Sequence, residues 1–136
     1  MRALALASLL TCLAVQANDE LVVVVSQASP VQQLSRAAVS ALYLGILGTN
    51  EVNHDLKPLD LQDGNVRDDF YKQLLGRSRN QMRAYWSRMV FTGKGKPPRA
   101  YTANEVHQAL LANPALIAYL PRSQLDATLR PLLTLP

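Results

Sequence analysis

The stretch LVVVV, Leu21 to Val25, decides the fold class of this chain. A continuous run of apolar, mostly β-branched residues predicts a strand that is buried on both faces. Other elements must cover such a strand, and the segments that follow it along the chain have the apolar spacing of helices. We therefore expect a small α/β domain built on this strand.

A polar turn, Ser26 to Pro30, follows the buried run and leads into a first helix. The helix is expected to start at Ser35, because Leu34 and Val39 are spaced as the hydrophobic staple of a helix N-terminus. Its apolar stripe is expected to run on to Ile46, and Gly45 and Gly48 are expected to end the helix.

The remaining segments alternate in the same way and predict a small twisted sheet flanked by helices. Caps, glycines and prolines mark their boundaries. The expected elements are a strand at Lys57–Leu61, a helix from Asp63-Gly64-Asn65 to Gly76, a helix from Ser78, a loop at Gly93–Pro98, a helix opened by the Thr102–Glu105 capping box and stopped at Asn113-Pro114, a strand at Ala115–Leu120, and an edge strand or short helix at Thr128–Leu135.

The chain begins with the pattern of a secretory signal. A basic start, Met1-Arg2, precedes the apolar run Ala3 to Val15, and Ala17 fits the small residue before a cleavage site. The run is too short to span a bilayer, which needs about 20 apolar residues. We expect a signal peptide at 1–17 and a single exported domain at 18–136, in the periplasm or secreted.

The only cysteine, Cys12, lies inside this predicted signal. The exported domain would then have no disulfide, thiol nucleophile or cysteine-bound metal. Lipoprotein processing at Cys12 is the alternative, although Thr11 before it is a poor residue for that cleavage.

Composition and charge narrow the functional classes. Of the 136 residues, 49% are apolar and 18% charged, which excludes a disordered chain and fits one domain. Nine basic residues lie between Arg67 and Arg99 against two acidic ones. This polarity predicts a basic surface for an anion, an acidic partner or a membrane, or else an ordinary solvated face. Its candidate residues are Arg79, Arg83, Arg88, Lys94 and Lys96.

Nucleic-acid binding is not expected from this basic segment. Tyr85 and Trp86 alternate with arginines, as in stacking platforms, but they share one apolar helix stripe with Met89 and so belong to a core. The predicted export also argues against a nucleic-acid partner.

The turn before the second helix, Gln62 to Asn65, is a candidate anion site. Free N–H groups at a helix start favour a negative group, and Arg67 could bind the same anion. Simple capping is the other interpretation, because Asp68 and Asp69 already place carboxylates in the first turn.

No catalytic motif is present, so the sequence predicts no enzyme and no cofactor. The two histidines, His54 and His107, are not spaced as metal ligands, and no metal site is expected.

Four stretches together resemble the periplasmic phosphate-binding proteins of ABC transporters. They are VVVVSQASPVQQLSRAAVSALYLG (Val22 to Gly45), LQDGNVRDDF (Leu61 to Phe70), YWSRMVFTGKGKPP (Tyr85 to Pro98) and LANPALIAYLP (Leu111 to Pro121). The resemblance implies one lobe of a type II periplasmic-binding-protein-like fold, because full-length members have two lobes and about twice this length.

The resemblance also implies a function and a site. It implies an exported substrate-binding-protein-like domain that recognises phosphate or another small anion. The family's Ser-Gly-Thr-Arg turn falls on Gly64, Asn65, Val66 and Arg67, so both of its hydroxyl donors are replaced here. Ser26 and Ser29 could supply hydroxyls to the ligand or only stabilise their own turn.

The alternative is a non-enzymatic interaction module that kept the fold and lost the ligand. Its basic strip would bind an acidic periplasmic protein or a membrane surface. A homodimer that rebuilds a two-walled cleft also remains open.

Overall fold

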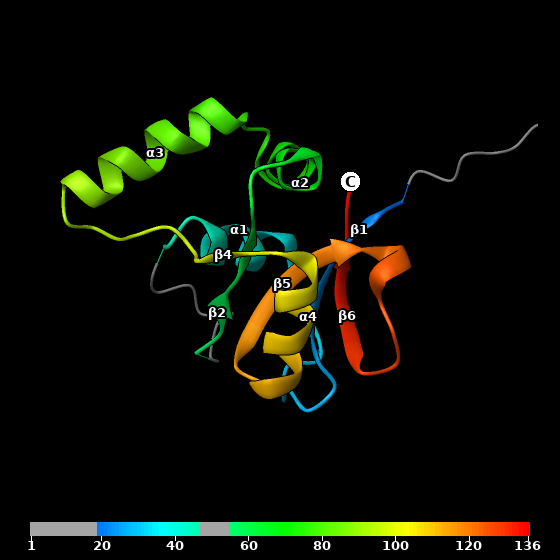
Figure 1. Ribbon diagram of the computed structural model, residues 1–136. Coiled ribbons are helices and arrows are strands. Elements are labelled where there is room, and N and C mark those ends of the chain that lie inside the picture. Colours follow the sequence, from blue (N-terminus) through cyan, green and yellow to red (C-terminus); the bar gives the residue numbers. More distant parts are fainter. Residues whose placement is uncertain (1–18, 47–54) are drawn as a thin grey trace, which may run out of the picture.

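The computed structural model describes residues 19–46 and 55–136. The predicted signal segment, the lipoprotein alternative at Cys12, and His54 lie outside the described residues. Figure 1 shows a sheet with helices packed around it and one helix, α3, that extends away from the body.

Helices and strands alternate along the chain as the sequence predicts. The order is β1 (Leu21–Ser26), α1 (Arg36–Tyr43), β2 (Lys57–Pro58), β3 (Asp60–Leu61), α2 (Asn65–Leu75), α3 (Arg79–Phe91), β4 (Ala100–Tyr101), α4 (Ala103–Ala112), β5 (Leu116–Pro121), the short 3-10 helix η1 (Arg122–Gln124) and β6 (Leu129–Thr134). The fold is therefore α/β, and Thr128–Leu135, for which a helix was the alternative, contributes an edge strand.

The main sheet has the strand order β2-β5-β1-β6. β1 is antiparallel to both of its neighbours: Leu21 pairs with Pro121 of β5, and Val22 pairs with Thr134 of β6. The short strand β2 runs parallel to β5. All six residues of β1 are buried, which confirms the prediction of a strand covered on both faces. In Figure 1, α4 lies in front of this sheet and α1 behind it.

The predicted single strand at 57–61 is wrong, because this segment changes partners within three residues. The Leu59 N–H still bonds to the Ile117 carbonyl of β5 (2.8 Å), whereas the Asp60 N–H bonds to the Arg99 carbonyl (2.9 Å). Asp60–Leu61 then pairs with β4 in a separate two-stranded sheet. This second sheet carries the chain from the main sheet to the start of α2.

Ser35 caps α1 as predicted: its side chain accepts a hydrogen bond from the Ala38 N–H. The helix ends at Tyr43, and Gly45, one of the two glycines expected to end it, turns the chain with a φ of +67°. The expected burial of Ile46 is therefore wrong, and its side chain is 51% exposed. Beyond a left-handed glycine, helical spacing no longer decides which face a residue occupies.

The later helices are closed by local signals. Thr102 and Glu105 form the predicted capping box of α4, and Ser78 and Gln81 form a second one on α3. Gly76 ends α2 in the left-handed conformation. These contacts satisfy helix-end N–H and C=O groups within a few residues, so the short helices have sharp ends.

Four aromatic rings from α1, α2 and β5 pack together in the core. Phe70 and Tyr119 are stacked with ring centroids 3.6 Å apart, and Tyr43 meets both rings edge-on. Tyr71 contacts the group from the next position on α2. This aromatic cluster packs α1 and α2 against β5 of the main sheet.

The chain's two phenylalanines give a matched test of this packing. Phe70 is fully buried, whereas Phe91 is 92% exposed. We expect Phe70→Ala to lower the free energy of unfolding by about 3–5 kcal/mol, since it removes a stacked ring and leaves a cavity. Phe91→Ala should change it by less than about 0.5 kcal/mol. Urea unfolding of both variants measures this, and equal losses would contradict the described core.

Candidate functional site

A buried carboxylate lies where β3 meets α2. Asp60 is 1% exposed. Its Oδ1 accepts hydrogen bonds from the Tyr119 hydroxyl (2.5 Å) and the Leu61 N–H (2.8 Å), and its Oδ2 accepts one from the Tyr71 hydroxyl (2.6 Å). Because both carboxylate oxygens have hydrogen-bond donors inside the protein, Asp60 stabilises the fold and does not need a ligand.

Arg67, the predicted anion ligand, is held between two carboxylates. Its Nε lies 3.3 Å from Asp60 Oδ2, and its Nη1 lies 2.6 Å from Asp63 Oδ1. Its guanidinium also lies over the Tyr71 ring. Burial alone would lower the pKa of Arg67, but Asp60, the two tyrosines Tyr71 and Tyr119, and Asp63 together outweigh it, so the net shift is upward. The cation is therefore permanent, and part of its charge is already neutralised.

Asp63 links α2 to α3 through two arginines. Its Oδ1 accepts from Arg67 (2.6 Å) and its Oδ2 accepts from Arg83 (3.0 Å). Desolvation raises the pKa of Asp63, but the hydrogen bond from Arg83 and the charges of Arg67, Arg79 and Arg83 together more than compensate, so the net shift is downward. Two converging guanidiniums thus hold a carboxylate at this point of the surface.

A second ion pair ties the same two helices together. Arg79 of α3 donates through Nε (2.9 Å) and Nη2 (2.7 Å) to the two oxygens of Asp68 on α2. This bidentate hydrogen bond is the main cause of the lowered pKa of Asp68.

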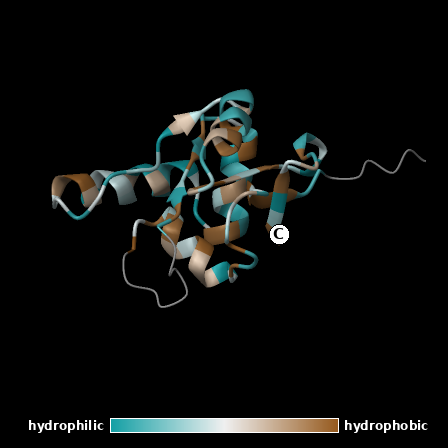
Figure 2. Cartoon of the chain, turned by 90° about the horizontal axis from the view of Figure 1, so that it is seen from below, coloured by the Kyte–Doolittle hydropathy of each residue, from teal (hydrophilic) through white to brown (hydrophobic). Residues whose placement is uncertain are grey.

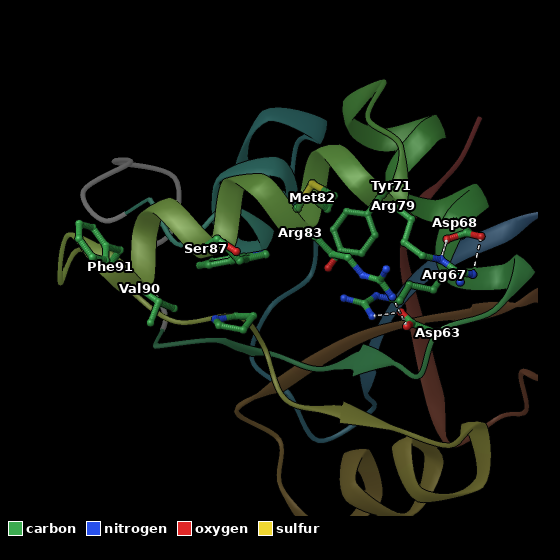
Figure 3. Close-up of a pocket in the computed structure, with 12 residues that line it drawn as sticks. Asp63, Arg67, Asp68, Tyr71, Arg79, Met82, Arg83, Ser87, Val90 and Phe91 are labelled. Carbon is green, nitrogen blue, oxygen red and sulfur yellow. Dashed lines mark hydrogen bonds and ion pairs between the residues drawn. The ribbon is translucent and has the colours of Figure 1, made fainter.

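These ion pairs lie at one end of a cavity between α2, α3 and the loop that follows α3. Its volume is about 660 Å³. In Figure 3 the charged side chains gather at one end, while Val90 and Phe91 lie at the other end of α3. The lining residues are Asp63, Arg67, Asp68, Tyr71, Arg79, Met82, Arg83, Trp86, Ser87, Val90, Phe91 and Pro97.

The apolar wall of the cavity includes the chain's only tryptophan, Trp86. The ring packs close to two glycines, because a Cβ on Gly45 would lie 3.1 Å from it and one on Gly95 would lie 3.9 Å from it. The Trp86 Nε1 is buried, and no acceptor for its N–H lies among the described residues. Trp86 is therefore a natural optical probe of this cavity.

The other residues of the predicted turn take ordinary places at the start of α2. Gly64 is the N-cap and has extended backbone, Asn65 is exposed, and Val66 is half-buried against the core. No side chain caps the helix start. The N–H groups of its first turn therefore remain the donors that the anion-site hypothesis requires.

Ser26 and Ser29 are not brought together with this turn. Val25 pairs with Ile117 near the beginning of β5, whereas α2 starts beyond the opposite end of that strand. In Figure 1 the loop after β1 lies at the bottom and α2 at the top. The Ser26 and Ser29 hydroxyls accept hydrogen bonds from the Ala28 and Val31 N–H groups of their own turn.

The predicted basic surface divides into two parts. Arg79 and Arg83 are bound to Asp68 and Asp63 and belong to the cavity. The other three residues are exposed near the far end of α3 and in the loop after it, and none forms an ion pair with the described part of the chain: Arg88, Lys94 and Lys96.

Two features relevant to a metal or a membrane are missing from residues 19–46 and 55–136. They contain no group of three His, Cys, Asp or Glu side chains placed to hold a metal ion. None of their helices has the length and apolarity needed to cross a bilayer.

Comparison with known proteins identifies the fold. No protein-family model and no curated protein sequence matches the chain. Its structure is similar to that of an ABC-type phosphate transport receptor from Vibrio cholerae, with a TM-score of 0.62 and 17% sequence identity. The match covers 84% of this chain and 45% of the receptor, so the chain spans about half of that protein's length. The chain therefore has the α/β fold of one lobe of a phosphate-binding protein, as the resemblance implied.

The tyrosines around Asp60 should not titrate while the protein is folded. Burial, followed by the charge of Asp60, raises the pKa of Tyr43, Tyr71 and Tyr119 above the ordinary value of 10.0. Their contribution to stability is complete below pH 10 and is lost as the pH rises toward the folded-state values. We expect their tyrosinate absorbance to appear only as alkaline unfolding proceeds, followed in parallel by circular dichroism.

The variant Tyr119→Phe supplies the control for this titration. One tyrosinate fewer should appear in the step that accompanies unfolding. Ionisation of these groups with the circular dichroism unchanged would contradict the burial described for them.

Proposed function

We propose that this chain is an exported, non-enzymatic binding protein that recognises phosphate or another small anion in the α2–α3 cavity. The observation that carries the proposal is Asp63, whose two carboxylate oxygens are bound by Arg67 and Arg83 at the edge of the cavity. A point at which two guanidiniums converge on one anion suits a ligand anion as well. Asp63 precedes α2 in an exposed turn and its side chain is 44% exposed, so it can move aside.

The proposal predicts that this chain binds its anion with low affinity. An incoming anion must displace Asp63 from Arg67 and Arg83, and Asp60 keeps its hold on Arg67. The family's hydroxyl donors are replaced by Gly64 and Val66, so backbone N–H groups and guanidiniums are the donors left. Each charge-assisted hydrogen bond lost in this way lowers affinity by about 1.5–3 kcal/mol.

The cavity walls favour an anion that carries an apolar group over a bare inorganic ion. Among the apolar side chains that line the cavity, Val90 is 55% exposed and can be covered by a ligand, whereas Met82 and Trp86 are already nearly fully buried. Covering apolar area adds about 25 cal/mol per Å² to binding, which phosphate alone cannot gain. We expect phenyl phosphate to bind more tightly than phosphate, and sulfate to bind no more tightly than phosphate.

The decisive experiment is a fluorescence titration of Trp86 with these three anions, in the wild type and in Asp63→Asn. Removing the competing carboxylate frees Arg67 and Arg83, so the dissociation constant for phosphate should fall about tenfold, or 1.4 kcal/mol. A gain of affinity on losing a charge is not expected of a residue that only stabilises the fold.

Two arginines on α3 provide the matched control. Arg83→Gln should abolish anion binding because it removes one of the two converging guanidiniums. Arg88→Gln should leave binding intact, since Arg88 is an exposed arginine on the same helix that does not line the cavity. Equal loss in both variants, or no phosphate binding by Asp63→Asn, would refute a specific anion site.

A further inference from the structure

The far end of α3 carries a feature that the charged end of the cavity does not use, although Val90 and Phe91 also line the other end of the cavity. We call it the α3 tip and define it by five residues: Arg88, Val90, Phe91, Lys94 and Lys96. Figure 1 shows α3 extending away from the body of the domain, with the loop after it running back toward β4. The tip is therefore the most protruding part of the described chain.

The tip exposes large apolar side chains. Phe91 is 92% exposed and Val90 is 55% exposed. In Figure 2 the outer end of α3 is coloured as hydrophobic, at the edge of the molecule. An exposed aromatic ring beside an exposed valine is apolar surface that folding alone does not require.

Local hydrogen bonds fix the shape of the tip. The Thr92 hydroxyl donates to the Arg88 carbonyl (2.8 Å), and the Lys94 N–H donates to the Met89 carbonyl (2.9 Å). Gly93 between them has a φ of +68°, a conformation that favours glycine. The chain thus turns sharply after Phe91 and brings Lys94 back beside the end of the helix.

The cations of the tip are uncompensated. Arg88, Lys94 and Lys96 are exposed and make no ion pair with the described part of the chain. All ten acidic residues of the sequence lie outside residues 79–99, a segment that has six basic ones. An anionic surface can therefore approach the tip without meeting a carboxylate of that segment.

A second copy of this chain is a poor occupant for the tip. Pairing two tips would oppose Arg88, Lys94 and Lys96 of one copy with the same three cations of the other, and like charges in contact destabilise an interface. A folded protein partner would need a binding pocket whose shape is complementary to a protruding helix end. A lipid surface is fluid and needs no such shape, and it accepts aromatic rings at headgroup level and cations among anionic headgroups.

We propose that the α3 tip docks on an anionic lipid bilayer, with Phe91 and Val90 at the interface and Arg88, Lys94 and Lys96 among the headgroups. This proposal is a specific form of the interaction-module alternative, with the α3 tip as the binding surface and an anionic membrane as the partner. It does not rest on the anion site, since it uses neither Arg67 nor Arg83.

Vesicle co-sedimentation tests the proposal. The full chain is expressed in a bacterium and purified without further processing. Mass spectrometry determines the N-terminus of each purified variant. Vesicles of phosphatidylglycerol and phosphatidylcholine in equal parts are compared with phosphatidylcholine alone. We expect binding to the anionic vesicles, and weakening with added salt because the attraction is screened.

Two matched pairs of variants locate the contact. Lys94→Gln/Lys96→Gln should lower the partition coefficient by about fivefold per charge. Lys57→Gln/Lys72→Gln removes two exposed lysines away from α3 and should leave it unchanged. Phe91→Ala should lower it by about tenfold. Leu111→Ala, at a 48% exposed leucine of α4, should leave it unchanged.

Equal effects of the tip and control variants would overturn the proposal, because any retained N-terminal segment is common to all of them. Absence of selectivity for anionic vesicles would overturn it too and would favour an acidic protein as the partner. The Trp86 titration with phosphate, run on the same preparations, shows separately whether the anion site survives or fails.

Discussion

The buried carboxylate of Asp60 is the interaction on which the rest of the structure depends. It lies at the point where the chain leaves the main sheet, and its partners come from β3, β5 and α2. A charge taken out of water is tolerated only when donors surround it, so the position of each partner is constrained by the others. These contacts therefore fix the position of the start of α2 relative to β5, and so they also fix the cavity wall that α2 forms.

The same constraint explains why the candidate site is both ordered and partly self-neutralised. Arg67 is the link between the buried Asp60 and the exposed Asp63, and Asp63 in turn binds Arg83 on α3. The carboxylates and guanidiniums form a chain that runs from the core to solvent. A ligand anion can compete with Asp63, at the solvent end of this chain, without disturbing the core end.

Local sequence signals predicted most of the fold. The valine run at 22–25, the Ser35 and Thr102 caps and the glycine after α2 act over a few residues, and the structure has each of them. The error at 57–61 lies where distant residues compete. The Asp60 N–H bonds to the Arg99 carbonyl and no longer to β5. The residue spacing within 57–61 carries no information about that partner.

The site was predictable to a smaller degree. The turn before α2 and the basic residues Arg79 and Arg83 could be singled out from the sequence. Asp63 of that turn does line one cavity together with Arg67, Arg79 and Arg83, whereas Gly64, Asn65 and Val66 do not. The role of Asp60 could not be predicted, because an aspartate between two leucines gives no sign that two tyrosines and an arginine will meet it. Nor does the sequence indicate that Ser26 and Ser29 end up at the opposite end of the sheet.

The placement of β1 also has a consequence for how the protein is made. Among the described strands, β1 lies between β5 and β6, so Leu21 pairs with Pro121, and the Leu21 carbonyl accepts from the N–H of Leu135. Contacts this distant along the chain form slowly and only after the C-terminal strands are available. The core of the domain therefore cannot close around β1 until the segments that form β5 and β6 have been synthesised and can pair with it.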